Sequence, residues 1–282
     1  MKKSILLSIV LMLVLSIPSV GFAGVGGPTS YSYSTYNAKN GLTLNIIQTT
    51  PENIKFETLS KGKSLTNSSF YGINGGYFTP AGRTLHIAVK NDKPITGVGS
   101  DGGKGGNGWY NHYETKGEKG TSTVVWDGDK RSFSIQKVWD AGSISVKNRK
   151  NYWAQGGFGM HLGNSNWRKL AEDEGLTGST SPAMGRTALV YHKSSVYLIV
   201  TNVPEEDKKT DNKKNHHTHS QFRDAVQQYF NITDGSSSSS VNGVFLDGSG
   251  SSQMKAISNT NKVVNVTGDG RQLVQIISLI NQ

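Results

Sequence analysis

The sequence predicts an α+β fold in a single domain, with a mixed β-sheet core and few helices. Many short segments are rich in β-branched and aromatic residues and are bounded by Gly, Asn, Asp or Pro, which is typical of β-strands. Only two segments have the apolar periodicity of a helix. No repeat and no long linker divides the chain, so one domain with a shared core is the simplest arrangement.

Segments with the strand pattern occur along most of the chain. They are residues 42–50, 70–78, 85–91, 122–128, 131–139, 187–203, 242–248 and 273–280. The sequence HKSS at 192–195 separates two apolar runs and indicates a hairpin turn. A helix is predicted over 219–230, with Ser220 as its N-cap, and a shorter helix over 167–174. The apolar face of the longer helix consists of Phe222, Val226, Tyr229 and Phe230.

Residues 1–23 have the features of a signal peptide. Lys2 and Lys3 precede a short apolar stretch, and the small residues Gly21 and Ala23 fit signal-peptidase cleavage after Ala23. The apolar stretch is short for a membrane span, and an uncleaved N-terminal anchor is the alternative. We therefore expect a secreted protein without membrane association after cleavage, in which residues 24–69 supply the N-terminal strands of the domain.

The chain has no cysteine, which excludes lipoprotein anchoring and thiolate metal sites. The roughly 260 residues left after cleavage can bury an adequate core without disulfides. The net charge is +10, and loss of Lys2 and Lys3 leaves +8, which favours anionic partners. Outside a cell such partners are cell-wall teichoic acids and acidic polysaccharides, not nucleic acid. The alternative is that the charge serves only solubility.

Three segments of biased composition are predicted to be exposed loops: residues 100–120, 204–219 and 233–242. The first is rich in glycine and aromatic residues, so a lid that stacks on a sugar ring is the alternative. The second contains His216, His217 and His219, which raises the alternative of a metal site. Their spacing is not that of a helical zinc pair, so a solvated loop is the preferred interpretation.

The sequence FLDGSGSSQM at 245–254 places Asp247 between an apolar strand and a run of small residues. Such a run allows backbone N–H groups to converge on an anion, and its hydroxyls can add donors. The run consists of Gly248, Ser249, Gly250, Ser251 and Ser252. The alternative is a turn in which the Asp247 side chain caps its own backbone.

Polar or flexible residues also occur at the ends of other predicted strands. Asn74, Gly75 and Gly76 follow one strand and leave room for close backbone approach. Arg186 directly precedes a second strand, and Arg271 lies just before a third. Two arginines at strand ends could bind a phosphate in bidentate fashion, although an isolated arginine is more often a surface salt-bridge residue.

The order of these motifs resembles the phosphodiester glycosidase family, which includes a mammalian lysosomal enzyme and secreted bacterial and phage proteins. The resemblance spans residues 70–282, and its matched positions are residues 74–78, 186–188, 246–252 and Arg271. The chain departs from the family pattern at Ser249, which replaces a glycine, and in the Lys-rich segment 204–219. These departures affect the expected substrate more than the expected reaction.

The resemblance implies hydrolysis of a sugar 1-phosphodiester, which releases the sugar from the bridging phosphate. A phosphodiester leaving group needs little protonation, whereas an ordinary glycosidase protonates its leaving oxygen with a carboxylic acid. The implied catalytic residues are Asp247, as base or nucleophile at the anomeric carbon, together with Asn74 and Arg186. The implied substrate- and phosphate-binding residues are Gly75, Gly76, Thr187, Gly248, Ser249, Gly250, Ser251, Ser252 and Arg271.

His86 and His161 lie near the matched motifs in the sequence and are further candidates for substrate binding. Asp101, Glu172 and Asp269 are candidates for a second carboxylate without support from a motif. No cofactor and no metal are expected, and the sequence predicts no particular oligomeric state.

We therefore expect an exported glycoside hydrolase that cleaves sugar-1-phosphodiester bonds in cell-wall teichoic acid or similar glycosylated phosphate polymers. The alternative is a non-catalytic module that binds wall polymer or polysaccharide. A structural protein of a spore or virion surface is the third alternative.

Overall fold

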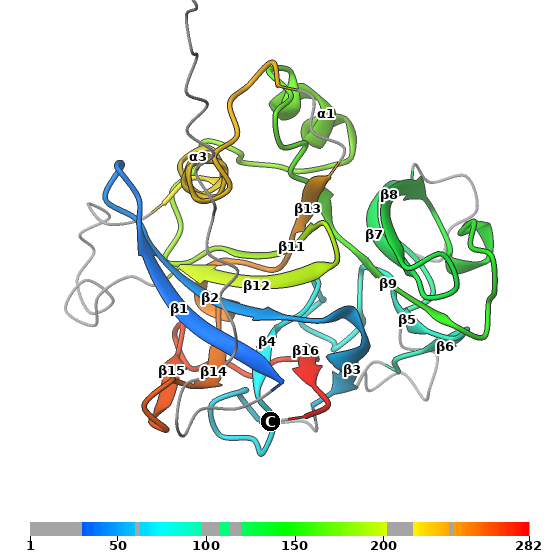
Figure 1. Cartoon of the computed structure of the whole chain (residues 1–282), viewed down its shortest axis with the longest axis horizontal. Coiled ribbons are helices and arrows are strands. Elements are labelled where there is room, and N and C mark those ends of the chain that lie inside the picture. Colours follow the sequence, from blue (N-terminus) through cyan, green and yellow to red (C-terminus); the bar gives the residue numbers. More distant parts are fainter. Residues whose placement is uncertain are drawn as a thin grey trace, which may run out of the picture.

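The computed structural model describes residues 30–59, 63–96, 108–112, 120–201, 217–236 and 240–281. In this part of the chain, three antiparallel sheets and two α-helices form the fold (Figure 1). The predicted α+β class with few helices is therefore confirmed. The strands are β1 (Tyr31–Asn37), β2 (Thr43–Thr49), β3 (Ile54–Thr58), β4 (Gly72–Asn74), β5 (Ala88–Lys90), β6 (Lys93–Pro94), β7 (Thr121–Asp127), β8 (Ser132–Val138), β9 (Tyr152–Gly156), β10 (Phe158–Gly159), β11 (Thr187–His192), β12 (Ser195–Thr201), β13 (Val241–Phe245), β14 (Met254–Ile257), β15 (Val263–Val266) and β16 (Gln275–Leu279). The helices are α1 (Trp167–Asp173) and α3 (His219–Tyr229).

The central sheet has its strands in the order β1-β2-β12-β11-β13-β10. Its strands β11 and β12 form the hairpin that the sequence at 192–195 predicted. Successive side chains of a strand point to opposite faces, so Leu198 and Val200 enter one apolar cluster while Tyr197 and Ile199 enter another. Both faces of the sheet are covered, which explains the nearly continuous apolar run in these strands.

A second sheet, in the order β15-β14-β4-β16-β3, packs against one face of the central sheet. Ile73 of β4 and Ile277 of β16 share an apolar cluster with Leu189 of β11. A third sheet, in the order β6-β5-β9-β7-β8, lies beside the other two (Figure 1). Trp153 of β9 belongs to the same cluster, so one core joins the three sheets.

Helices α1 and α3 cover the other face of the central sheet (Figure 1). Helix α3 is capped by Thr218, whose Oγ1 accepts the Gln221 N–H at 3.0 Å. The Gln221 side chain accepts the Thr218 N–H in return at 2.9 Å, which completes a capping box. The predicted helix is therefore confirmed, but the prediction of Ser220 as its N-cap is wrong, because Thr218 supplies the cap.

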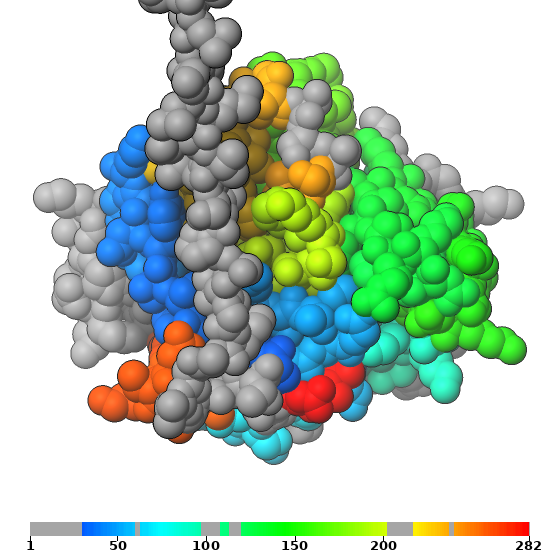
Figure 2. Space-filling view, in the orientation of Figure 1, coloured from blue at the N-terminus to red at the C-terminus, as the bar shows by residue number. Residues whose placement is uncertain are grey.

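The two ends of the described chain lie next to each other. Ser30 Oγ donates to Asn281 O at 2.7 Å, and the Ile280 N–H donates to Asn53 O at 2.9 Å. Figure 2 shows the blue N-terminal and red C-terminal segments on the same face. The predicted signal peptide, residues 1–23, lies outside the described residues. Among the residues that are described, we find no helix with the length and apolarity of a membrane span.

Candidate functional site

Asp247 follows β13 and lies beside the loop after β4. Its N–H donates to Gly75 O at 3.2 Å, so two motifs that are far apart in the sequence meet here. Its Oδ1 accepts the Gly248 N–H at 3.0 Å, and the residue keeps part of its surface exposed. Burial of the carboxyl raises the pKa of Asp247 from 3.8 to about 6, although Ser251, Gly248 and Arg271 lower it.

Asn74, the last residue of β4, connects Asp247 to three other segments. Its Oδ1 accepts from Thr187 Oγ1 at 2.9 Å and from the Gln253 N–H at 3.0 Å. Its Nδ2 donates to Asp247 O at 2.8 Å and to Gly75 O at 3.3 Å. An amide side chain offers two donor hydrogens and two acceptor sites, so the protein itself uses all of them. Asn74 is thus placed to fix the Asp247 backbone and has no group left to orient a sugar or a water molecule.

Replacing Asn74 by Leu should destabilise the protein strongly. The Gln253 N–H, the Thr187 hydroxyl and the Asp247 carbonyl would lose a buried partner, so we expect the free energy of unfolding to fall by about 3 kcal/mol. Chemical denaturation of both proteins measures the change, and Asn37→Leu at an exposed strand end is the control. Equal stability of the wild type and the Asn74 variant would contradict this role for Asn74.

Thr187, Ser252, Gly75 and Gly76 support the site from within the protein. The Thr187 and Ser252 hydroxyl oxygens are buried and 3.2 Å apart. The Gly76 N–H donates to Gln275 Oε1 at 2.7 Å, and a Cβ on Gly75 would lie 2.3 Å from Gln275 Cδ. The two glycines therefore leave room for a side chain of the protein, and no ligand is needed to explain them.

Arg186 is buried next to the Asp247 loop and forms no ion pair with any described carboxylate. Its Nε donates to His217 O at 3.0 Å, and one terminal nitrogen donates to Ser181 O at 2.6 Å. A Cβ on Gly248 would lie 3.3 Å from the other terminal nitrogen, so this nitrogen faces the Asp247 loop. A buried cation without a counter-charge is costly. An anionic ligand group beside Gly248 would supply that counter-charge.

Tyr77 and His219 also border Asp247 and Arg186, although neither was among the predicted catalytic or substrate-binding residues. Burial raises the pKa of Tyr77, the Asp247 carboxylate raises it further, and the Arg186 guanidinium lowers it. Burial lowers the pKa of His219 to about 3, and the Arg186 charge lowers it as well. Both side chains are therefore neutral near pH 7. The one feature of the sequence that points to Tyr77 is its position in the motif at residues 74–78.

The run after Asp247 forms a short 3₁₀ helix, Ser249–Ser251, instead of an open nest. The Ser249 N–H donates to Gly185 O at 2.8 Å, and the Ser252 N–H donates to Ser249 O at 3.2 Å. The Gly248 N–H donates to Asp247 as well. Most of the backbone N–H groups that were predicted to bind an anion therefore already donate to groups of the protein. Arg186, whose terminal nitrogen faces Gly248, is a further donor beside this run.

Ser249 has a φ of 56°, in the left-handed region that favours glycine. A glycine at this position would adopt that conformation without strain. The serine in this chain keeps the turn and places a hydroxyl at the edge of the site.

Arg271 is paired with Asp269 at the edge of the site. Its Nε donates to the two carboxylate oxygens at 3.0 Å and 2.9 Å. The carboxylate offsets much of the guanidinium charge, so Arg271 should attract a phosphate less strongly than Arg186 does. The two arginines named as possible phosphate clamps therefore differ in their surroundings: Arg271 is paired with Asp269, whereas Arg186 forms no ion pair with a described carboxylate.

Of the two candidates for a second carboxylate that the structure describes, Asp269 is the one near Asp247. Its charge contributes to the raised pKa of Asp247, and a Cβ on Gly250 would lie 2.0 Å from its Oδ2. Glu172 accepts a hydrogen bond from a serine beside helix α1. Asp101 lies outside the described residues.

His86 and His161 lie in a second layer behind Tyr77. The His86 ring is 5.3 Å from the Tyr77 ring, and Phe158 contacts both rings, with centroids at 5.1 Å and 5.2 Å. Burial lowers the pKa of His86 to about 3. His161 Nε2 lies 3.4 Å from the buried Glu174 carboxylate. His86 is therefore linked to the site through Tyr77, whereas His161 faces Glu174.

Several buried side-chain polar atoms lack a well-formed hydrogen bond. In the described part of the chain they are His86 Nδ1 and Nε2, His161 Nε2, His219 Nδ1, Ser251 Oγ and Thr121 Oγ1. Such atoms are rare because an unpaired buried polar group costs free energy. His219 lies beside Arg186, and Ser251 lies beside Asp247, where a hydrogen bond from its side chain lowers the pKa of the carboxyl. Across these same residues, no group of three or more His, Cys, Asp or Glu side chains is arranged to hold a metal.

The two loops that carried alternative predictions lie mostly outside the described residues. In the first, Tyr110 packs against Trp139 with ring centroids 4.9 Å apart, and Trp109 packs against the third sheet. In the second, His219 is buried and the His217 carbonyl holds Arg186. The prediction of a solvated loop is therefore wrong for His219, which helix α3 places against the central sheet.

No protein-family model matches the sequence, and no curated protein sequence matches it. Among solved structures, the chain is similar to a hypothetical protein from Synechocystis, with a TM-score of 0.44 and 10% sequence identity. That alignment covers 89% of this chain and 62% of the Synechocystis chain.

Proposed function

We propose that the protein is an exported hydrolase that cleaves sugar-1-phosphodiester bonds in glycosylated phosphate polymers such as cell-wall teichoic acid. One observation carries the proposal: the Asp247 carboxyl and the buried Arg186 guanidinium, which forms no ion pair with a described carboxylate, border the same small-residue loop. A carboxylate and a cation so placed could act on one ligand that has an anionic group and an electrophilic carbon. A sugar-1-phosphodiester has both.

In the proposed reaction, Arg186 binds the phosphate while Asp247 acts at the anomeric carbon. The bond between that carbon and the bridging oxygen breaks, and the phosphate monoester leaves with the electron pair. Arg186 stabilises the leaving group electrostatically, so no carboxylic acid is needed to protonate it. Asp247 either activates the attacking water or attacks the carbon itself before water releases the sugar.

Tyr77 has a supporting role in this proposal. Its raised pKa keeps the hydroxyl protonated near neutral pH, so it can donate a hydrogen bond between the two charged groups. The Asn74 network holds the Asp247 backbone at a fixed position relative to the loop after β4. Preorganised donors of this kind need little rearrangement during the reaction.

A panel of synthetic sugar-1-phosphodiesters, varied in sugar and in aglycone, tests this proposal. We expect the purified protein to release free sugar from at least one member. Retained binding of a wall polymer without sugar release from any member would instead support the non-catalytic binding module.

The pH dependence of the reaction should follow the ionisation of Asp247. Because the pKa of Asp247 is about 6 and the carboxylate is the reactive form, kcat/KM should rise from pH 4 to pH 7 and then level off. The rate at pH 4 should be roughly 100-fold below the plateau. Initial rates on a short phosphodiester between pH 4 and pH 8 measure this profile. A rate that falls over the same range would contradict a carboxylate base or nucleophile.

A further inference from the structure

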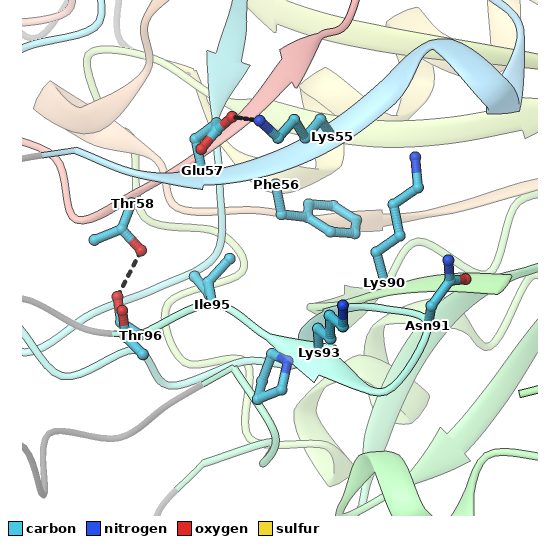
Figure 3. A pocket seen from close by; sticks show the side chains of 10 residues that line it. Lys55, Phe56, Glu57, Thr58, Lys90, Asn91, Lys93, Ile95 and Thr96 are labelled. Atoms are coloured by element: carbon cyan, nitrogen blue, oxygen red, sulfur yellow. Dashed lines mark hydrogen bonds and ion pairs between the residues drawn. The ribbon is translucent and has the colours of Figure 1, made fainter. Parts of the chain in front are cut away.

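A cationic pocket of about 520 Å³ lies away from Asp247, between strand β3 and the β5–β6 hairpin (Figure 3). Its walls include Lys55 on β3 and Lys90 and Lys93 on the hairpin. Phe56 and Ile95 form its apolar floor and are 7% and 8% exposed. A volume of this size suits a small ligand or one unit of a polymer.

The charges of the pocket are only partly balanced. Lys55 pairs with Glu57 at 2.5 Å, whereas neither Lys90 nor Lys93 forms an ion pair with a described carboxylate. Burial lowers the pKa of Lys90, the Lys55 ammonium lowers it further, and Glu52 raises it. Ammonium groups of opposite walls therefore repel each other across the pocket, and an anion between them would relieve this repulsion.

The hydrogen bonds of the pocket leave donors available for a ligand. Lys90 Nζ donates to Ile54 O at 2.9 Å, which holds its ammonium group at the side of the pocket. Thr58 Oγ1 donates to Thr96 O and joins the two walls at one end (Figure 3). Lys93 is exposed on the β5–β6 hairpin and forms no ion pair with a described carboxylate.

The pocket is connected to the Asp247 site through strand β16. Thr58 pairs with Gln275 on β16, and the Gln275 side chain accepts the Gly76 N–H. A polymer that repeats its negative charge has further units for such a pocket to bind while one unit occupies the catalytic position. When two units of one polymer bind at two sites, the overall affinity for the polymer rises, although the affinity of each single site stays the same.

We infer that this pocket binds an anionic unit of a glycopolymer and forms a second binding site for the chain on which the protein acts. Its lysines bind the phosphate or carboxylate group, and Phe56 and Ile95 contact the carbon skeleton. The inference rests on the proposed function for its choice of ligand, but the pocket can be tested without any hydrolysis.

The test measures binding of a synthetic glycerol-phosphate oligomer, which has no sugar-1-phosphodiester and is not a substrate for the proposed reaction. The variant Lys55→Gln/Lys93→Gln should bind it roughly tenfold more weakly than the wild type. The matched control Lys137→Gln/Lys262→Gln removes two exposed lysines elsewhere and should bind within about twofold of the wild type. An oligogalacturonate of equal charge, tested in the same way, distinguishes carboxylate from phosphate recognition.

Equal loss of affinity in both double variants, or no binding by the wild type of either oligomer, would overturn the inference. The Lys55/Lys93 variant should also hydrolyse a short sugar-1-phosphodiester at the wild-type rate, because the pocket lies outside the catalytic site. Absence of hydrolysis in the wild type would overturn the proposed function and leave the oligomer measurements decisive for the pocket.

Discussion

Asp247→Asn should abolish sugar release while the protein still binds its substrate. The amide keeps the size of the carboxylate but can neither activate water nor attack the anomeric carbon, so kcat should fall by about 10³-fold. Arg186 is unchanged in this variant, so the affinity for the phosphate group should be largely retained. Initial rates of sugar release and equilibrium binding of the same phosphodiester measure the two quantities separately.

Stability measurements provide the folding control for this variant. The pKa of Asp247 is about 6 in the folded protein and near 3.8 when it is unfolded, so the folded state holds its proton more tightly. The ionised form therefore destabilises the folded state, and this penalty develops as the pH rises from about 4 to 6 and persists above it. Asp247→Asn removes the penalty and should be up to about 3 kcal/mol more stable than the wild type at pH 7.

Below pH 4 the wild type and the Asp247 variant should have similar stability, and Asp129→Asn at an exposed turn should have no comparable effect at either pH. Hydrolysis at the wild-type rate by the Asp247 variant would contradict the role of this carboxylate.

Arg186→Lys should reduce kcat/KM by about 100-fold although the positive charge is kept. The guanidinium reaches two carbonyl groups, His217 O and Ser181 O, while its other terminal nitrogen faces Gly248. A lysine has one nitrogen and cannot hold this position and bind a phosphate at the same time. Steady-state kinetics on a short phosphodiester measure the loss.

Arg131→Lys, at an exposed turn, is the matched control and should leave the kinetics unchanged. Arg271→Lys should have a smaller effect than Arg186→Lys, since Asp269 already pairs with Arg271. A larger loss of kcat/KM in Arg271→Lys than in Arg186→Lys would show that Arg271, and not Arg186, is the main residue that binds the phosphate.

Much of the fold could be predicted from the sequence because its longest strands are regular. Strands β11 and β12 are apolar on both faces, and helix α3 has a clear apolar face, so local pattern and final structure agree. Strands β1 and β9 were missed as individual elements. The polar, tyrosine-rich β1 pairs at the edge of the central sheet, and β9 is framed by glycine and asparagine. Their pairing partners, rather than their own residues, decide their structure.

The candidate site was predicted in part. Asp247, Asn74 and Arg186 come together as the motifs suggested, because β13 and β4 end where β11 begins. Asn74 was expected among the catalytic residues, but its side chain hydrogen-bonds to Gly75, Asp247, Thr187 and Gln253 of the protein itself. It therefore positions Asp247. No sequence pattern shows that His219 is buried beside Arg186, since this depends on where helix α3 packs.

The most direct test of the central claim is hydrolysis of a sugar-1-phosphodiester in water labelled with heavy oxygen. Mass spectrometry then shows which product contains the label. The proposed mechanism breaks the bond between the anomeric carbon and oxygen, so the label should appear in the released sugar and not in the phosphate. Label in the phosphate, or no product from any substrate tested, would contradict a glycosidase that acts through Asp247.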